Sequence, residues 1–338
     1  MGHDWLLVET LSEEPTVVAQ GAKLQDLVPL ATFLRRSPYR AALQTAITET
    51  VQSGESLASI TPKHGRVIRT EPVKMPDGRV HGVQVWVGPA SAEPPERQYP
   101  GALKWDLTSH TAIDTRESLV NAGRNLHAEG IHERAFADEL PARELTHNEA
   151  QVVALAIKAE PGQALCSSWD VTDWQDAPIR VAFVARISLE PTPEGADHLV
   201  ARGMNWRGQL EEEILAPDQL AQRVLDALAQ PGVHRALVDL DTWTLLRWLD
   251  EPCPFYDWRS GDLGEQRVHP DDAPLMEAMR AEFEHGPTSR VLRLRRVDDD
   301  WVPLHVTVNR IELEDDEPMG LVALRLPTDA ELADAGLR

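Results

Sequence analysis

The segment VHPDDAPLMEAMRAEF, residues 268–283, places His269 close to Asp271 and Asp272. Imidazole and carboxylate groups bind metals and transfer protons, so this segment is the first candidate for chemistry. No second histidine lies nearby at a recognised ligand spacing, and the chain has no HExxH pattern. Pro270 suits a helix start, and an aspartate at 271 or 272 can accept hydrogen bonds from the N–H groups of the first turn. We therefore interpret the segment as a helix cap and predict neither a metal site nor a catalytic residue.

Cysteine chemistry is the second candidate. Cys166 lies in ALCSSWD and Cys253 in EPCPFYDW, and neither has a CxxC partner or a recognised protease context. Both are interpreted as small buried hydrophobic residues. An enzyme site in the middle of the chain, built around Cys166 with a nearby histidine or aspartate, is kept as the alternative. An increased thiolate fraction at Cys166 would favour that alternative, because the thiolate is the nucleophile.

Three further histidines, His127, His132 and His147, gather in one stretch without a metal-ligand pattern. His127 and His132 are five residues apart, which places them on different sides of a helix, so we interpret them as surface residues. The GxSxG nucleophile motif, the Walker A motif and GxGxxG are also absent from the sequence. No catalytic residue is predicted.

Binding is a better prospect than catalysis. The stretch ARGMNWRG, residues 201–208, places basic side chains beside a tryptophan on an expected strand, where they can hold an anion or simply pack at a sheet edge. Tryptophans number ten against three tyrosines, and exposed tryptophan is enriched at binding hot spots. The candidate residues for a binding surface or pocket are Trp206, Arg202, Cys166, Trp301 and His305.

Composition narrows the classes of partner. The 338 residues carry a net charge of −22, which disfavours nucleic acid because each phosphate contact needs lysine or arginine. No apolar run is long enough for a membrane span, and the N-terminus has no secretory pattern, so we expect a cytoplasmic protein. The length suits two or three domains.

Elements are expected in three groups. In the first group, strands at 5–10 and 16–20 precede a helix over 39–51 and strands at 56–60, 66–74 and 79–87. Its helix is indicated by apolar residues at three- and four-residue steps. The Pro-rich stretch 88–101 is interpreted as a linker. Domains are therefore expected at 1–90, 102–215 and 216–338, with the linker assigned to 91–101.

The middle group has a strand pair around 104–115, helices near 117–126 and 146–159, and strands at 164–171, 180–189 and 198–206. A helix over 209–230 leads to the last group, which has a strand pair within 234–250, the helix after Pro270, and strands at 290–297, 301–313 and 319–326. The tail 329–338 is a short helix or disordered. An internal repeat is suggested by laying 65–80 over 289–302.

The segment His269 to Asp272 at a helix start, followed by the strands of 289–324, resembles the C-terminal part of a PAS domain. In that fold a helix introduces three antiparallel strands. Residues 1–90 resemble a more degenerate PAS unit, and 102–215 is similar to a GAF module. The whole chain resembles the mycobacterial PAS–GAF–PAS proteins. The resemblance implies an α+β fold with three modules, each an antiparallel sheet flanked by helices.

The same resemblance implies a sensory protein without an effector domain. Such a protein acts in signal transduction through protein–protein interaction, with small-ligand binding in its cores. No flavin, bilin or haem signature is present, so no cofactor is predicted. The sequence leaves open the ligand, the protein partner and whether the chain forms a homo-oligomer. A structural scaffold with solid cores is the third alternative.

Overall fold

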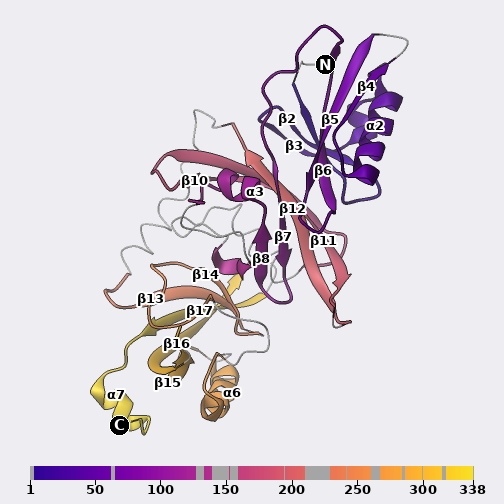
Figure 1. Ribbon diagram of the computed structural model, residues 1–338. Helices are drawn as coiled ribbons and strands as arrows, with labels where there is room; N and C mark the ends of the chain where they lie inside the picture. The colour runs from indigo at the N-terminus through magenta and orange to yellow at the C-terminus, as the bar shows by residue number, and fades with distance from the viewer. Residues whose placement is uncertain are drawn as a thin grey trace. The chain divides into compact units, whose positions relative to one another are not determined.

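Three antiparallel sheets carry most of the regular structure (Figure 1). The computed structural model describes residues 4–61, 65–126, 133–138, 152, 159–193, 195–209, 229–240, 242–259, 267–283, 286–298, 300–313 and 317–337. The α+β class with three antiparallel sheets is thus confirmed. The chain divides into two compact units. Unit 1 consists of residues 1–108, 112–133 and 159–214, and unit 2 of residues 109–111, 134–158 and 215–338.

The N-terminal sheet has six strands in the order β3-β2-β1-β6-β5-β4. The strands are β1 (Leu6–Glu9), β2 (Thr16–Gln20), β3 (Lys23–Pro29), β4 (Leu57–Thr61), β5 (Arg66–Lys74) and β6 (Val80–Pro89). Five of these were expected from the sequence. The sixth, β3, was missed because its residues alternate poorly and are only half-buried or exposed.

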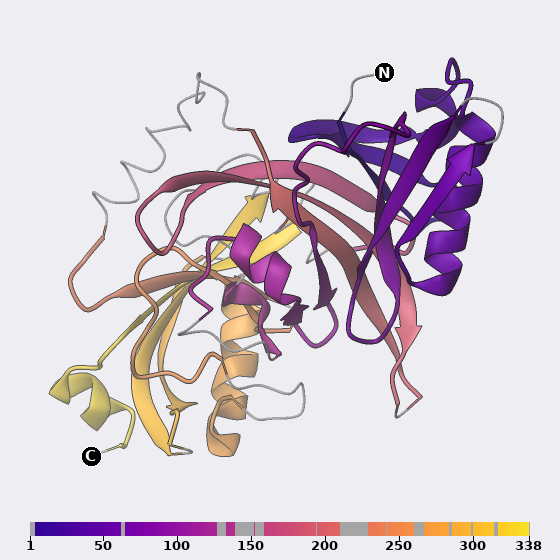
Figure 2. The same cartoon turned by 45° about the horizontal axis from the view of Figure 1, so that its top comes forward.

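Two helices follow β3, namely α1 (Leu30–Phe33) and α2 (Arg40–Ser53). Helix α2 lies against one face of the N-terminal sheet in both views (Figures 1 and 2). It buries Leu43, Ala46, Ile47 and Thr50, which recur at the three- and four-residue steps of one helix face. Gly54 ends the helix with a φ of 67°, the left-handed conformation that glycine adopts most readily.

The middle domain supplies a second sheet, whose strands in unit 1 follow the order β10-β11-β12-β7-β8. The strands are β7 (Gly101–Asp106), β8 (Thr111–Asp114), β10 (Ala164–Thr172), β11 (Pro178–Pro191) and β12 (Asp197–Arg207). One helix, α3 (Arg116–Asn121), packs against β7 and begins where Thr115 accepts a hydrogen bond from the Ser118 N–H. The prolines and glycine of residues 190–197 predict a turn, and β11 and β12 indeed form an antiparallel hairpin that closes with the pair Pro191 and Asp197.

The N-terminal and middle sheets share a hydrophobic cluster inside unit 1. Buried residues of both sheets belong to it, namely Leu7, Val18, Ala19, Val73, Met75, Ala102, Ala182, Val184, Met204 and Trp206. Gly82 shows how closely the strands approach. A Cβ atom there would lie 2.6 Å from the side chain of Met204 and 2.7 Å from the carbonyl oxygen of Val8. The two domains are therefore packed together although the sequence suggests separate modules.

Unit 2 contains the third sheet, in the order β14-β13-β17-β16-β15. The strands are β13 (His234–Asp239), β14 (Leu245–Trp248), β15 (Thr288–Arg295), β16 (Trp301–Leu313) and β17 (Glu317–Arg325). Helix α6 (Ala273–Glu282) precedes the last three strands, and α7 (Asp329–Asp334) follows them. The short strand β9 (Arg134–Ala135) and a 3-10 helix, Phe136–Asp138, also lie in this unit.

The two end domains share the order of five strands, to which the N-terminal sheet adds β3 at one edge. In each, the first strand pairs with the second and the last, and a helix (α2 or α6) precedes the final three strands. The suggested repeat of 65–80 over 289–302 is wrong in register, since it lays β5, the middle of three strands, over β15, the first of three. The true counterpart of β5 is β16.

Several expectations concern residues outside the described part of the chain. These are the helix over 209–230, most of the helix over 146–159, and the histidine cluster His127, His132 and His147. Expected strand boundaries elsewhere agree with the structure to within a few residues. The expected helix at 117–126 is shorter in the structure, since α3 ends at Asn121.

Candidate functional site

The segment at 268–283 is a helix start in which the histidine caps the helix. His269 is the N-cap of a short 3-10 helix, Pro270–Asp272, and its Nδ1 accepts a hydrogen bond from the Asp271 N–H at 3.2 Å. The assignment of the cap to an aspartate is therefore wrong. His269 also lies edge-on to Trp301, with ring centroids 5.0 Å apart. These two contacts explain why a histidine occupies position 269.

Asp272 turns away from the helix and pairs with a strand. Its carboxylate accepts hydrogen bonds from the Arg293 backbone N–H at 2.7 Å and from the Arg293 guanidinium at 2.6 and 3.1 Å. Burial alone would raise the pKa of Asp272, but these bonds hold it below the ordinary value. No group of three or more potential metal ligands occurs within the described ranges.

In unit 1, Arg202 forms a polar junction on β12. Its guanidinium binds both carboxylate oxygens of Glu190, at 2.7 and 2.9 Å, and also lies 2.7 Å from Asp77. The Arg202 side chain is only 7% exposed, so both acids neutralise it in a protected place. These partners raise the pKa of Arg202 despite its burial. An arginine already paired in this way has little capacity left for an external anion.

His81 completes this junction between the N-terminal and middle sheets. Its Nδ1 lies 2.7 Å from the Gly203 carbonyl and its Nε2 lies 3.3 Å from Arg202 Nη1. A neutral ring donates from Nδ1 and accepts at Nε2, which satisfies both contacts. Burial, with the nearby positive charge of Arg202, lowers the pKa of His81 to about 4. His81 is therefore neutral near pH 7.

Trp206 and Cys166 both contact the hydrophobic cluster of unit 1. They pack there and do not form a binding surface. Trp206 is 1% exposed, and Cys166 packs against the cluster that contains it. The Cys166 thiol donates to the Gln25 carbonyl at 3.5 Å. Burial and the negative charge of Asp26 raise the pKa of Cys166 to about 12. This shift is opposite to the one that a cysteine nucleophile requires.

Trp301 and His305 lie on one face of β16, four residues apart. The alternate residues Leu304 and Val306 are buried in the core of unit 2. His305 Nε2 lies 3.4 Å from Glu331, which also pairs with Arg325. Burial and the charge of Arg325 lower the pKa of His305. These two candidates therefore point away from the core of their domain.

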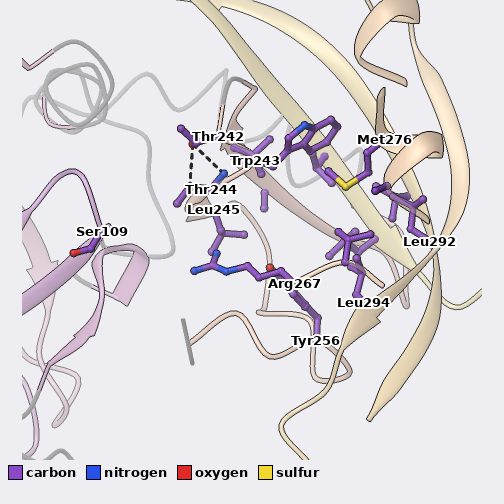
Figure 3. A pocket seen from close by; sticks show the side chains of 17 residues that line it. Ser109, Thr242, Trp243, Thr244, Leu245, Tyr256, Arg267, Met276, Leu292 and Leu294 are labelled. Atoms are coloured by element: carbon purple, nitrogen blue, oxygen red, sulfur yellow. Dashed lines mark hydrogen bonds between the residues drawn. The ribbon is translucent and has the colours of Figure 1, made fainter. Parts of the chain in front are cut away.

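The core of unit 2 holds a cavity of about 330 Å³ (Figure 3). None of the five sequence candidates lines it. Its lining residues are Ser109, Ala236, Val238, Thr242, Trp243, Thr244, Leu245, Tyr256, Arg267, Val268, Ala273, Met276, Leu292, Leu294, Val306, Val322 and Leu324. The walls are mainly aliphatic and aromatic, with a few polar groups, which is the usual composition of a small-molecule site.

The turn between β13 and β14 positions Trp243 at this cavity. The Thr242 hydroxyl donates to the Asp239 carboxylate at 2.7 Å. Its oxygen also lies 3.0 Å from the Thr244 hydroxyl and accepts a hydrogen bond from the Thr244 N–H (Figure 3). These bonds hold Trp243 at a φ of 59°, which is uncommon for a bulky residue. A left-handed tryptophan is not foreseeable from the pattern DTWT, so sequence reasoning missed it.

Helix α6 leaves the space that the cavity occupies. Met279 is its only buried residue, and Leu275 is 38% exposed although its spacing suggested a core position. Met276 is half-buried and lines the cavity beside Trp243 (Figure 3). The four-residue spacing of Leu275, Met279 and Phe283 predicts one apolar helix face, and this prediction is wrong for Leu275. The helix meets the sheet through Met279 and Phe283, and the space in front of Met276 stays open.

Comparison with known proteins identifies relatives for all three domains. Family profiles described as "Rv3651-like, N-terminal", "Rv3651-like, middle domain" and "Rv3651-like, C-terminal domain" match residues 4–96, 99–208 and 218–335. The crystal structure of an uncharacterized protein from Mycobacterium tuberculosis is 64% identical, with a TM-score of 0.91 and full coverage of both chains. No curated protein matches the sequence.

Two sensory proteins also resemble the chain, at much lower similarity. An RNA-binding light-oxygen-voltage receptor is 7% identical, with a TM-score of 0.23, over 71% of this chain and 95% of its own. The periplasmic sensory domain of the Campylobacter jejuni chemoreceptor Tlp1 is 13% identical, with a TM-score of 0.22, over 70% of this chain and 74% of its own. Neither likeness is strong enough to indicate a function. In the described part of this chain, no helix has the length and apolar character needed to cross a membrane.

Proposed function

This chain belongs to the Rv3651-like family and contains its three domains, and we propose that it is a sensory or adaptor protein working through a protein partner. In this proposal the C-terminal domain binds a small molecule, and its occupancy regulates the contact with the partner. The cavity of about 330 Å³ in unit 2 is the observation that carries the proposal. Its volume is at the lower end of the roughly 300–1,000 Å³ range typical of ligand pockets.

A PAS–GAF–PAS assignment of the three domains belongs to the same proposal. Its support is the helix that precedes three antiparallel strands in both end domains, α2 before β4 to β6 and α6 before β15 to β17. A cavity between such a sheet and its helix is a natural place for a ligand to act on the fold. Its walls include Leu292 of β15, Val306 of β16 and Val322 of β17, together with Met276 of α6.

An enzyme centred on Cys166 is the alternative proposal, and it has less support. The thiol is packed against a hydrophobic cluster, and its pKa is raised to about 12. At neutral pH almost none of it is then the thiolate that nucleophilic catalysis needs. Sensory binding remains the better supported of the two functions.

The experiment compares native mass spectra of the protein and two variants. All three are purified from the organism that naturally produces the protein. Val306→Phe places an aromatic ring in the cavity, and Val297→Phe, at a position 77% exposed, adds the same ring at the surface. We expect a retained small molecule on the wild type and on Val297→Phe, and its loss from Val306→Phe. Recovery of a co-purifying protein should change only in Val306→Phe.

Two results would contradict the proposal. The first is a wild-type protein without any bound small molecule. The second is a Val306→Phe variant that retains the ligand and the partner as the wild type does. Circular dichroism spectra of the three proteins check that each variant is folded.

A further inference from the structure

The cavity of unit 2 combines an apolar body with a positively charged end (Figure 3). Trp243 and Met276 lie together in one part of it, and Arg267 and Tyr256 lie together in another. The walls between them come from aliphatic residues, among them Leu292 and Leu294. A ligand that fills this space therefore meets apolar surface over most of its length and polar donors at one end.

Arg267 carries the charge of this polar end. No ion pair between Arg267 and a carboxylate occurs among the residues that the structure describes, although acidic residues outnumber basic ones by 55 to 33 in the sequence. Other arginines of unit 2 differ, since Arg235 pairs with Asp250 at 2.8 Å and Arg293 with Asp272 at 2.6 Å. A guanidinium with five N–H donors and no acidic partner among the described residues is suited to an anion from outside.

Tyr256 adds a second donor next to Arg267. Its hydroxyl oxygen accepts a hydrogen bond from the Arg267 side chain. A phenol that accepts at its oxygen still has its own O–H to donate. Burial raises the pKa of Tyr256, so the phenol keeps its proton at neutral pH. The two side chains together present N–H and O–H groups to one acceptor, the arrangement that a carboxylate requires.

The volume sets the size of the ligand. A cavity of roughly 150 Å³ holds benzene, and this one, at about 330 Å³, has room for about a dozen non-hydrogen atoms. Trp243 and Met276 suit an aromatic or aliphatic chain, since thioether and indole groups both pack well on apolar surface.

Building on the proposed function, we infer that the C-terminal cavity binds a small organic carboxylate, with its apolar body against Trp243 and Met276 and its charged group on Arg267 and Tyr256. The ligand class is a monocarboxylic acid with an aromatic or aliphatic chain. Sensing would then depend on the charge of the ligand as well as on its shape.

A matched pair of probes tests this inference by calorimetric titration of the full chain. The probes are 4-phenylbutyrate and its amide, 4-phenylbutanamide, which have the same number of non-hydrogen atoms and differ in charge. We expect the wild type to bind the carboxylate about tenfold or more tightly than the amide, because a charge-assisted hydrogen bond is stronger than a neutral one. Arg267→Gln should abolish this preference and still bind the amide, and Tyr256→Phe should reduce it.

Arg296→Gln is the control, since Arg296 is 48% exposed, pairs with Asp298 and does not line the cavity. It should keep the full preference. Equal binding of both probes to the wild type, or a preference that survives in Arg267→Gln, would overturn the inference while leaving a ligand-binding cavity intact. If neither probe binds the wild type, the inference fails, and the retained ligand in the native mass spectra then decides the proposed function separately.

Discussion

The N-terminal and C-terminal domains share a strand order and differ in how a helix fills the space beside the sheet. Helix α2 has 14 residues and buries Leu43, Ala46, Ile47 and Thr50, whereas α6 has 10 residues and buries only Met279. The C-terminal domain accordingly keeps a cavity of about 330 Å³. One topology can therefore have a filled core or keep a cavity, depending on the side chains of a single helix.

A second difference concerns what covers the N-terminal sheet on the side away from α2. Leu7 and Val18 of that sheet belong to a cluster with Val184 and Trp206 of the middle sheet, and buried Glu9 pairs with Arg186 at 3.1 Å. The N-terminal sheet is thus covered by α2 on one face and by the middle sheet on the other. Its stability therefore depends on contacts with the middle domain as well as on α2.

The largest expected effect is a cavity-forming substitution in the filled core. Leu43→Ala should cost about 2–5 kcal/mol of folding free energy, because Leu43 is 1% exposed and its neighbours cannot close the gap completely. Met276→Ala in α6 is the matched change and should cost about half as much or less, since Met276 is half-buried and already borders open space. Urea denaturation of both variants measures the difference. Equal losses would remove the contrast between the two helices.

Acid should destabilise unit 1 through His81. The folded-state pKa of His81 is about 4, below its ordinary value of 6.5, so the unfolded chain binds the proton first as the pH falls. Stability from neutral His81 is complete above pH 6.5 and decreases as the pH falls toward 4, by up to about 3 kcal/mol. Denaturation at pH 7 and pH 4.5 should show this loss in the wild type.

His81→Gln keeps an amide donor and acceptor at this position and removes the titrating group. The variant should therefore lose less stability than the wild type between the two pH values. An unchanged pH dependence would mean that other groups of the junction, such as Asp77 and Glu190, determine it.

A smaller effect is expected at the helix start of the C-terminal domain. Asp272→Asn should destabilise it by about 1–3 kcal/mol, because Arg293 loses its carboxylate partner in a place where the Asp272 side chain is only 8% exposed. Asp271→Asn is the control, with a side chain that is 74% exposed, and should change the melting temperature little. Similar losses in both variants would contradict the separate roles given to the two aspartates.

The smallest effect concerns thiol reactivity. Cys166 should react slowly with iodoacetamide at pH 7, and its rate should keep increasing up to pH 10 without reaching a plateau, because its pKa is raised to about 12. Peptide mass spectrometry separates Cys166 from Cys253, whose pKa is also raised. A rate for Cys166 that levels off near pH 7 would support the enzyme alternative.

Most strands could be predicted because alternation of apolar and polar residues depends only on the chain itself. The sequence of β16, with Leu304, Val306 and Val308 on one face, predicts its bounds correctly. The missed strand β3 has no such alternation and forms because β2 offers it a free edge. The shared cluster of the first two sheets also depends on contacts distant in sequence, such as Gly82 with Met204.

The amino-acid sequence by itself determined the α+β class, the three sheets and the helix start after His269, since periodicity and capping are local properties. Only the tertiary structure decided which residues line the cavity. Trp243, Tyr256 and Arg267 come from a strained turn, a loop and the segment before α6, and none of them carries a recognisable pattern. The physical reason is that a cavity is the space left between packed elements, so it depends on the packing of all of them at once.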